Sequence, residues 1–266
     1  METPYKTVLI TGASSGIGAH AARFLASKGL HTILTARRKE KLRAIAEEIK
    51  IAGGSADYCS ADLSDETQRV ALFERIKKDH PIVDVLINNA GFGWYGFFHR
   101  MPRKTARSLL AVNVDAIMHL TSLFIPDMLV RKKGHIINIG SIAGSLPNQG
   151  IAMYSASKAF LDAFTTSLHR ELRGSGVHAS VMRLGAIDTE FYLRAREQKN
   201  GLPIPAEKMT VSVERVNRAI WRLLKRPRRV VYMPAYLRFA PPLFRLFAPV
   251  IDLAGPILLR RENKKD

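Results

Sequence analysis

A tyrosine and a lysine near the middle of the chain have the spacing of a proton-transfer pair. Tyr154 and Lys158 are four residues apart, so on a helix their side chains would lie on one face. A nearby ammonium group favours the phenolate, and we therefore expect it to lower the pKa of Tyr154 from about 10. Such a phenol can donate a proton to a carbonyl oxygen during reduction. Because pairs with this spacing are common, the prediction depends on the surrounding residues, beginning with Ser141, thirteen residues before the tyrosine.

A glycine-rich segment, residues 11–18, is typical of a loop that binds the pyrophosphate of a dinucleotide. It follows an apolar run that predicts a strand and precedes a predicted helix. Gly12, Gly16 and Gly18 would let the backbone turn tightly and approach phosphates at the helix N-terminus. The G-x-x-x-G-x-G spacing in this context argues against an ordinary turn. The other loop residues expected at the cofactor are Ser14, Ser15 and Ile17.

The end of the second predicted strand indicates which dinucleotide is bound. An acidic residue there would accept hydrogen bonds from the adenosine ribose. The sequence instead reads Thr35-Ala36-Arg37-Arg38, and arginine suits a phosphate. We expect NADP(H), with Arg37 as the main contact to the 2′-phosphate and Arg38 as support. The alternative is that both arginines are solvated at the start of a helix.

Short apolar runs alternate with longer amphipathic stretches along most of the chain, which predicts one α/β domain over residues 1–232. The runs are rich in β-branched residues, as in parallel strands covered on both faces. The expected fold is a doubly wound parallel sheet of the Rossmann type, with about seven strands and helices on both faces. The predicted strands are 7–11, 31–36, 55–59, 83–88, 135–139, 178–184 and 230–232. The predicted helices are 17–28, 38–51, 66–79, 104–131, 153–173 and 213–225.

The composition is ordinary for a soluble globular protein, with 47% hydrophobic residues, but the net charge of +18 indicates anionic partners. Cys59 is the only cysteine, which excludes an internal disulfide and suggests a reducing compartment. The N-terminus lacks the layout of a signal peptide, and no run of 18 uncharged apolar residues predicts a transmembrane helix. We therefore expect a cytoplasmic protein, either free or peripheral on a membrane.

Together these motifs resemble those of the short-chain dehydrogenase/reductase family, over about residues 5–232. The matching motifs are T-G-x-x-x-G-I-G, Asn88-Asn89-Ala90-Gly91, Asn113, Ser141 and Tyr154-x-x-x-Lys158. The resemblance implies that Tyr154 gives its proton to a carbonyl oxygen while hydride arrives from the nicotinamide, and that Ser141 hydrogen-bonds that oxygen. It implies that Lys158 lowers the pKa of Tyr154 and binds the nicotinamide ribose. Asn113 would hold a water that relays protons to Lys158.

The resemblance also implies further cofactor contacts. Asp62, followed by Leu63, would lie at the adenine, and residues 88–91, including Asn89, Ala90 and Gly91, would support the sheet beside the cofactor. The nicotinamide carboxamide would meet Gly185, Ile187 and Thr189. The family usually begins this last loop with Pro-Gly, whereas this chain has Leu184-Gly185. The missing proline removes a constraint on φ, so the path of residues 184–190 is left open.

The expected substrate is a hydrophobic small molecule, because aromatic residues follow two of the predicted strands. Trp94, Phe97 and Phe191 would line its pocket beside Ser141 and Tyr154. The alternative is that these aromatics only pack the domain. A sterol or steroid, a long-chain acyl compound or another lipophilic ketone would fit.

Metal ions and nucleic acids are not expected as partners. No metal-ligand spacing is present among His99, His119, His135, His169 and His178. The basic C-terminal segment lacks the stacking platform or recognition motif of a nucleic-acid binder.

The last segment, residues 233–266, differs from the rest in being apolar, basic and interrupted by five prolines. We expect any helices there to be short and kinked. The segment could lie on an anionic membrane surface, cover the pocket or pack in a homodimer, or be disordered.

The sequence as a whole predicts an NADP(H)-dependent oxidoreductase that interconverts a carbonyl and a secondary alcohol, in lipid metabolism. The alternative is a non-catalytic NADP-binding regulator or scaffold of the same fold. By family resemblance, a homodimer or homotetramer would form through the helices at 104–131 and 153–173.

Overall fold

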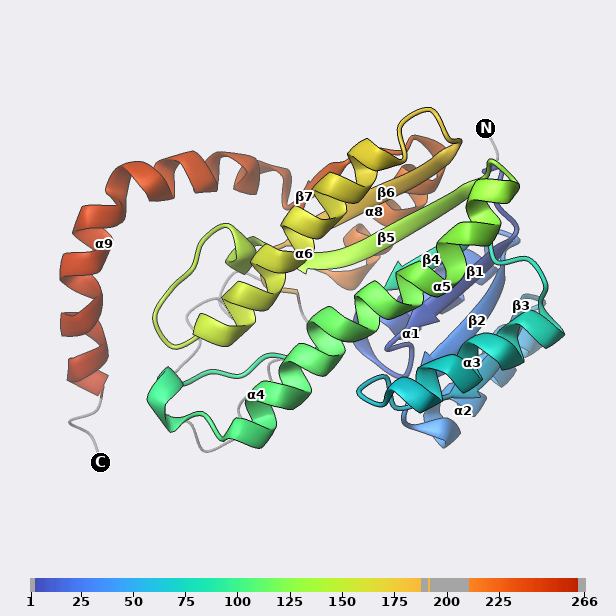
Figure 1. Ribbon diagram of the computed structural model, residues 1–266, viewed down its shortest axis with the longest axis horizontal. Coiled ribbons are helices and arrows are strands. Elements are labelled where there is room, and N and C mark those ends of the chain that lie inside the picture. The colour runs from blue at the N-terminus through green and yellow to red at the C-terminus, as the bar shows by residue number, and fades with distance from the viewer. Residues whose placement is uncertain (1–2, 188–190, 192–210, 263–266) are drawn as a thin grey trace.

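A seven-stranded sheet forms the centre of the computed structural model, which describes residues 3–187, 191 and 211–262 (Figure 1). All neighbouring strands pair in parallel, in the order β3-β2-β1-β4-β5-β6-β7. The strands are β1 (Thr7–Thr11), β2 (His31–Ala36), β3 (Ser55–Ser60), β4 (Val85–Asn88), β5 (Gly134–Ser141), β6 (Val177–Leu184) and β7 (Val230–Met233). The order reverses between β1 and β4, which places a crevice at the carboxyl ends of these strands. The predicted fold class is confirmed.

Helices cover both faces of the sheet because each buries one apolar stripe against it. Helices α1 (Gly16–Ala26), α2 (Lys39–Ile51) and α8 (Val213–Lys225) share one core with residues such as Leu25, Ile45 and Ile220. Helices α3 (Glu66–Asp79), α5 (Ala116–Val130) and α6 (Ala152–Glu171) share the other, with residues such as Leu72 and Phe124.

The long helix predicted at 104–131 is interrupted. It consists of α4 (Arg103–Leu110), a π-helical turn η2 (Ala111–Asp115) and α5. By length and composition the stretch 103–130 could cross a bilayer. It packs along the body of the protein, however, and its Leu109, Asn113, Phe124 and Met128 are buried.

The C-terminal segment corrects the expectation of short helices. After the 3₁₀ turn η5 (Ala235–Phe239), α9 (Ala240–Glu262) continues as one 23-residue helix. Pro241 and Pro242 fall in its first turn, where the missing N–H groups need no partner. Pro249 and Pro256 each remove one hydrogen bond further along, and the helix bends without ending, as Figure 1 shows.

Candidate active site

The residues that the sequence singles out gather at the carboxyl edge of the sheet. Ser141 ends β5, and Tyr154 and Lys158 lie on the first turns of α6. The glycine-rich loop follows β1, and Asn89 follows β4 at the next strand. Asn113 lies on the π turn η2. Residues up to 146 positions apart are thus joined at one edge, where open α/β sheets bind ligands.

Tyr154 is buried, and its phenol lies close enough to Ser141 for hydrogen bonding to act on its pKa. The Ser141 hydroxyl also accepts a hydrogen bond from the Ala143 amide at 3.1 Å, which fixes its direction. The expected lowering of the Tyr154 pKa is wrong for this structure: burial raises it to about 12, and the bond to Ser141 opposes only part of that rise. The phenol is therefore protonated at neutral pH, as a proton donor must be.

Lys158 is also buried, and its Nζ donates a hydrogen bond to the Ile139 carbonyl at 2.9 Å. Nζ lies 5.8 Å from the centroid of the Tyr154 ring, one helical turn away. Burial lowers the pKa of Lys158 to about 8, and the charge of Asp162 acts in the opposite direction. The side chain thus remains mainly cationic at pH 7.

Asn113 anchors the loop that follows β4. Its Oδ1 accepts from the Phe92 amide at 3.1 Å, and its Nδ2 donates to the Phe92 carbonyl at 3.0 Å and to Ser157 Oγ at 3.2 Å. Ser157 in turn donates to the Tyr154 carbonyl at 2.7 Å. Sequence reasoning missed Phe92 and Ser157. Ser157 lies within the Tyr154–Lys158 motif, next to Lys158. That position was the only feature of the sequence that could have marked it as a site residue.

The glycine-rich loop packs directly on the loop after β4. Gly12 has a φ of +64°, and a Cβ added there would lie 2.8 Å from Ala90 Cα. A Cβ on Gly18 would lie 2.6 Å from both Asn89 Nδ2 and the Gly12 carbonyl oxygen. Asn89 Nδ2 already donates to the Thr11 carbonyl at 2.9 Å. The loop thus has the bare, tightly held backbone that a dinucleotide pyrophosphate requires.

Two arginines follow β2, and Arg38, rather than Arg37, reaches the glycine-rich loop. The Arg38 guanidinium donates to Ser14 Oγ at 3.0 and 3.1 Å and to Ser15 Oγ at 2.7 Å. Arg37 is exposed. Ser15 is also the N-cap residue of α1, which begins at Gly16 with Ile17 and Gly18 in its first turn. A cation, two hydroxyls and a helix N-terminus therefore converge there, and all favour a phosphate.

The remaining predicted cofactor residues lie beside these loops. Asp62 follows β3 and accepts hydrogen bonds from the Ser64 amide at 3.0 Å and from the Ser64 hydroxyl at 2.8 Å. The side chain of Leu63 belongs to the hydrophobic core. Beyond the same edge, Gly91 is so near Asn113 that an added Cβ would lie 3.1 Å from Oδ1.

The loop after β6 is held by backbone pairing as far as Ile187. The Gly185 amide donates to the Met233 carbonyl at 2.8 Å, and the Val211 amide donates to the Ala186 carbonyl at 2.9 Å. Ile187 forms a parallel bridge with Val211 and is buried. Backbone pairing thus supplies the constraint that a proline would impose. Thr189 lies outside the described residues.

The aromatic residues differ in exposure. Trp94 is buried, and a Cβ on Gly96 would lie 2.6 Å from its ring. Phe97 is half-buried and stacks on His99 with ring centroids 5.9 Å apart. Phe191 lies beside Tyr154, with ring centroids 5.8 Å apart. The packing role is therefore strongest for Trp94, and Phe191 is the aromatic nearest the predicted proton donor.

Comparison with known proteins agrees with this geometry. The family model described as short chain dehydrogenase matches residues 6–200, and the chain belongs to that family. An uncharacterized oxidoreductase from Myxococcus xanthus is 34% identical over 207 residues, which cover 77% of this chain and 79% of the relative.

Two solved structures are similar over nearly the whole chain. A short-chain dehydrogenase from Sphingobium yanoikuyae in complex with NADPH is 31% identical with a TM-score of 0.79, covering 95% of this chain and 94% of its own. A bulky-bulky ketone specific alcohol dehydrogenase from Comamonas testosteroni is 27% identical with a TM-score of 0.76, covering 93% and 94%. The fold and the family were therefore both predicted correctly from sequence.

Proposed function

We propose that this chain is an NADP(H)-dependent oxidoreductase that interconverts a lipophilic carbonyl compound and its secondary alcohol. The observation that carries the proposal is the buried Tyr154 phenol beside Ser141, with Lys158 one turn away. These groups share a sheet edge with a loop suited to a dinucleotide. The intact set argues against a non-catalytic scaffold.

In reduction, Tyr154 would donate its proton to the carbonyl oxygen of the substrate. Burial keeps the phenol protonated until the substrate oxygen acquires negative charge. The Ser141 hydroxyl, held by the Ala143 amide, would hydrogen-bond that same oxygen and stabilise the developing charge. In oxidation the proton would pass from the alcohol to the phenolate.

Lys158 would stabilise the phenolate that remains after proton transfer. Its ammonium is held by the Ile139 carbonyl and would bind ribose hydroxyls of the cofactor. Asn113 would keep the Phe92 loop and α6 in register, since its side chain bonds to Phe92 and Ser157. A water relay that ends at Lys158 would start from this π turn.

NADP(H) would be held by the glycine-rich loop, by Asp62 and the loop at 89–91, and by Gly185, Ile187 and Thr189. When bound, the nicotinamide supplies or accepts the hydride. The hydrogen bonds from Arg38 to Ser14 and Ser15 favour Arg38 as the main 2′-phosphate contact, with Arg37 as support. The NADPH bound to the Sphingobium yanoikuyae enzyme supports the same cofactor.

The substrate would contact Phe191 and Phe97, with Trp94 as a rigid floor. An apolar lining with two polar groups at one end suits a ketone flanked by bulky hydrocarbon groups. The ketone specificity named for the Comamonas testosteroni enzyme supports this class.

The reaction is tested by following NADPH oxidation with a panel of bulky aromatic, steroidal and long-chain ketones. Tyr154→Phe is expected to lower kcat by at least about 10²-fold while NADPH affinity, measured by fluorescence, is unchanged. Tyr58→Phe removes a phenol on β3, far along the chain from the site, and should retain full activity. Undiminished turnover by Tyr154→Phe would sink the assigned role.

The cofactor preference is tested separately. Arg38→Ala is expected to weaken NADPH binding by roughly 10–100-fold, since a charge-assisted bond contributes about 1.5–3 kcal/mol, and to change NADH binding little. Arg37→Ala should have the smaller effect. If Arg37→Ala costs more, the assignment of Arg38 as the main contact is wrong.

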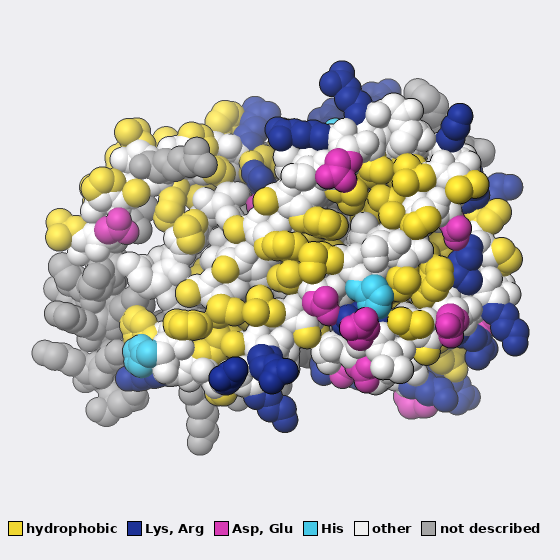
Figure 2. All heavy atoms as spheres, in the orientation of Figure 1, with side chains coloured by type: hydrophobic (Ala, Val, Ile, Leu, Met, Phe, Trp, Pro, Cys, Tyr) yellow, Lys and Arg dark blue, Asp and Glu magenta, His cyan; other side chains and the backbone are white. Residues whose placement is uncertain are grey.

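We further propose that residues 233–266 lie on an anionic membrane surface. Large apolar side chains are exposed along η5 and the first half of α9: Tyr236, Phe239, Leu243, Leu246, Phe247, Val250 and Leu253. Figure 1 shows α9 leaving the body of the protein, and Figure 2 shows hydrophobic side chains along it. Leu237 lies at Gly185, where an added Cβ would be 2.9 Å from its Cδ1, so the segment starts beside the cofactor loop.

Vesicle co-sedimentation with phosphatidylcholine and phosphatidylglycerol tests this placement. The combined change Leu246→Glu and Leu253→Glu should abolish binding, whereas Ile51→Glu and Ile82→Glu, at exposed apolar residues elsewhere, should not. Failure of the unaltered protein to sediment with vesicles would exclude a membrane role. A concentration-dependent dimer lost in the α9 variant would identify a second copy as the occupant.

A homodimer or homotetramer through α4, α5 and α6 is also proposed. Figure 2 shows hydrophobic side chains gathered over these helices, and Leu110, Leu129 and Val130 are exposed. Light scattering coupled to gel filtration measures the mass. A monomer at micromolar concentration would contradict this part of the proposal.

A further inference from the structure

Two histidines and an aspartate from three separate elements converge at one end of the sheet, away from the predicted active site. His31 is the first residue of β2, Asp57 lies in β3, and His80 directly follows α3. The active-site loops follow the carboxyl ends of β1, β4 and β5, whereas His31 lies at the amino end of β2. The cluster is therefore outside the machinery proposed for hydride transfer.

The sheet register explains why the side chains meet. His31 pairs with Ser55, and Asp57 is two residues further along β3, so all three project from the same face of the sheet. Helix α3 packs on this face, and His80 follows its last residue, Asp79. The rings of His31 and His80 lie with centroids 4.7 Å apart.

The distances between ligand atoms resemble those around a small metal ion. His31 Nε2 lies 3.5 Å from Asp57 Oδ2, and His80 Nε2 lies 3.3 Å from the same oxygen. One ligand atom from each of the three residues lies within 4.8 Å of the other two. In a tetrahedral zinc site with ligands at about 2.0–2.2 Å, neighbouring ligand atoms are about 3.3–3.6 Å apart.

His31 is also oriented as a ligand. Its Nδ1 is 2.7 Å from Ser55 Oγ, which leaves Nε2 directed toward Asp57. Nε2 is buried and makes no hydrogen bond within the described part of the chain. Ligating histidines ordinarily bond through the other ring nitrogen in this way, because that bond fixes the ring and its tautomer. The neighbouring cation is Lys50, whose Nζ is 4.0 Å from Asp57 Oδ1 and 3.4 Å from Glu47.

We propose that His31, Asp57 and His80 bind one Zn²⁺ ion, with solvent completing its coordination. Two imidazoles and a carboxylate form a recognised donor set for zinc. Lys50 is exposed enough to swing away to Glu47 when the ion arrives, since both side chains are about half exposed. The ion would tie β2 and β3 to the end of α3 and stabilise this edge of the sheet.

The test is a titration of the full-length, tag-free chain with Zn²⁺ by calorimetry and with Co²⁺ by visible absorption. We expect one site per chain, a tetrahedral Co²⁺ spectrum and a rise in Tm on adding Zn²⁺. Asp57→Asn and His80→Gln should each weaken Zn²⁺ binding by at least tenfold and remove the rise in Tm. Ser55→Ala, which only releases the orientation of His31, should weaken binding by roughly 10–100-fold.

His20→Gln provides the matched control, because His20 is an exposed histidine on another helix. It should bind Zn²⁺ as the unaltered chain does. Circular dichroism of each variant without metal establishes that it is folded. Absence of Zn²⁺ binding by the unaltered chain, or binding that survives both Asp57→Asn and His80→Gln, would overturn the proposal.

Discussion

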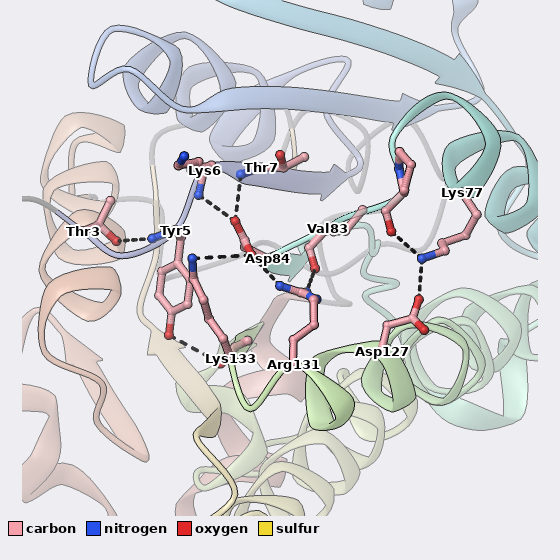
Figure 3. Close-up of polar contacts among 12 residues, drawn as sticks. Thr3, Tyr5, Lys6, Thr7, Lys77, Val83, Asp84, Asp127, Arg131 and Lys133 are labelled. Carbon is pink, nitrogen blue, oxygen red and sulfur yellow. Dashed lines mark hydrogen bonds and ion pairs between the residues drawn. The ribbon is translucent and has the colours of Figure 1, made fainter.

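Replacing Asp84 by alanine is expected to lower the free energy of unfolding by about 2–4 kcal/mol. Figure 3 shows this carboxylate between the N-terminal segment and the end of α5. Its side chain is 3% exposed, and it accepts hydrogen bonds from the Lys6 amide at 2.7 Å, the Thr7 amide at 3.3 Å and the Arg131 guanidinium at 2.8 Å. Breaking a buried pair typically costs about 3–5 kcal/mol, because the remaining partners lose their compensation. Arg131 is partly exposed and regains water, which reduces the expected loss.

Asp127→Ala is the matched control in the same figure. Asp127 pairs with Lys77, but their side chains are 48% and 29% exposed, so the expected loss is at most about 1 kcal/mol. Urea unfolding followed by fluorescence and circular dichroism measures both, provided that the two probes give one transition with an unchanged slope. Equal losses for the two variants, or a loss below about 1 kcal/mol for Asp84→Ala, would refute the burial argument.

Three further outcomes are expected. Gly18→Ala should weaken dinucleotide binding more than tenfold in a fluorescence titration, because its Cβ would collide with Asn89 and the Gly12 carbonyl; unchanged affinity would contradict the packing described. Ketone reduction should fall as the pH rises above about 8, where Lys158 loses its proton while Tyr154 keeps its own; in Lys158→Arg, which stays charged, a pH–rate profile should lack this decline. Burial lowers the pKa of His135 to about 3, so between pH 6.5 and 3 this imidazole is protonated only in the unfolded chain. The free energy of unfolding should therefore decrease as the pH is lowered across that range. His135→Gln should reduce that fall by about 2 kcal/mol between pH 6.5 and 5 in urea unfolding series, and an unchanged pH dependence would argue against the buried neutral ring.

The strands were predictable because their signal is local. Each of the seven predicted runs contains or overlaps an observed strand, and β1 and β2 have the predicted bounds. Continuous β-branched runs between glycine-marked helix ends leave few alternatives for such a chain. The loop after β1 was equally clear, because Gly12 and Gly18 are needed for a close approach that other residues would block.

Features that depend on three-dimensional neighbours could not be predicted. The sequence favoured Arg37 over Arg38, and only the direction of the chain after β2 sends Arg38 to the glycine-rich loop. The pKa of Tyr154 depends on how deeply α6 is buried, which outweighs its spacing from Lys158. His31 and His80 are 49 positions apart, and only the pairing of β2 with β3 and the course of α3 bring them together.

The π turn at residues 111–115 has a consequence for how the chain can change in length. One additional residue in a turn rotates everything beyond it by about 100° relative to an uninterrupted α-helix. Leu109 before the turn, Asn113 within it and Ala116 after it are all buried against the body of the protein. The loss of a single codon here would rotate α5 by about 100° relative to α4 and turn its buried residues away from the sheet.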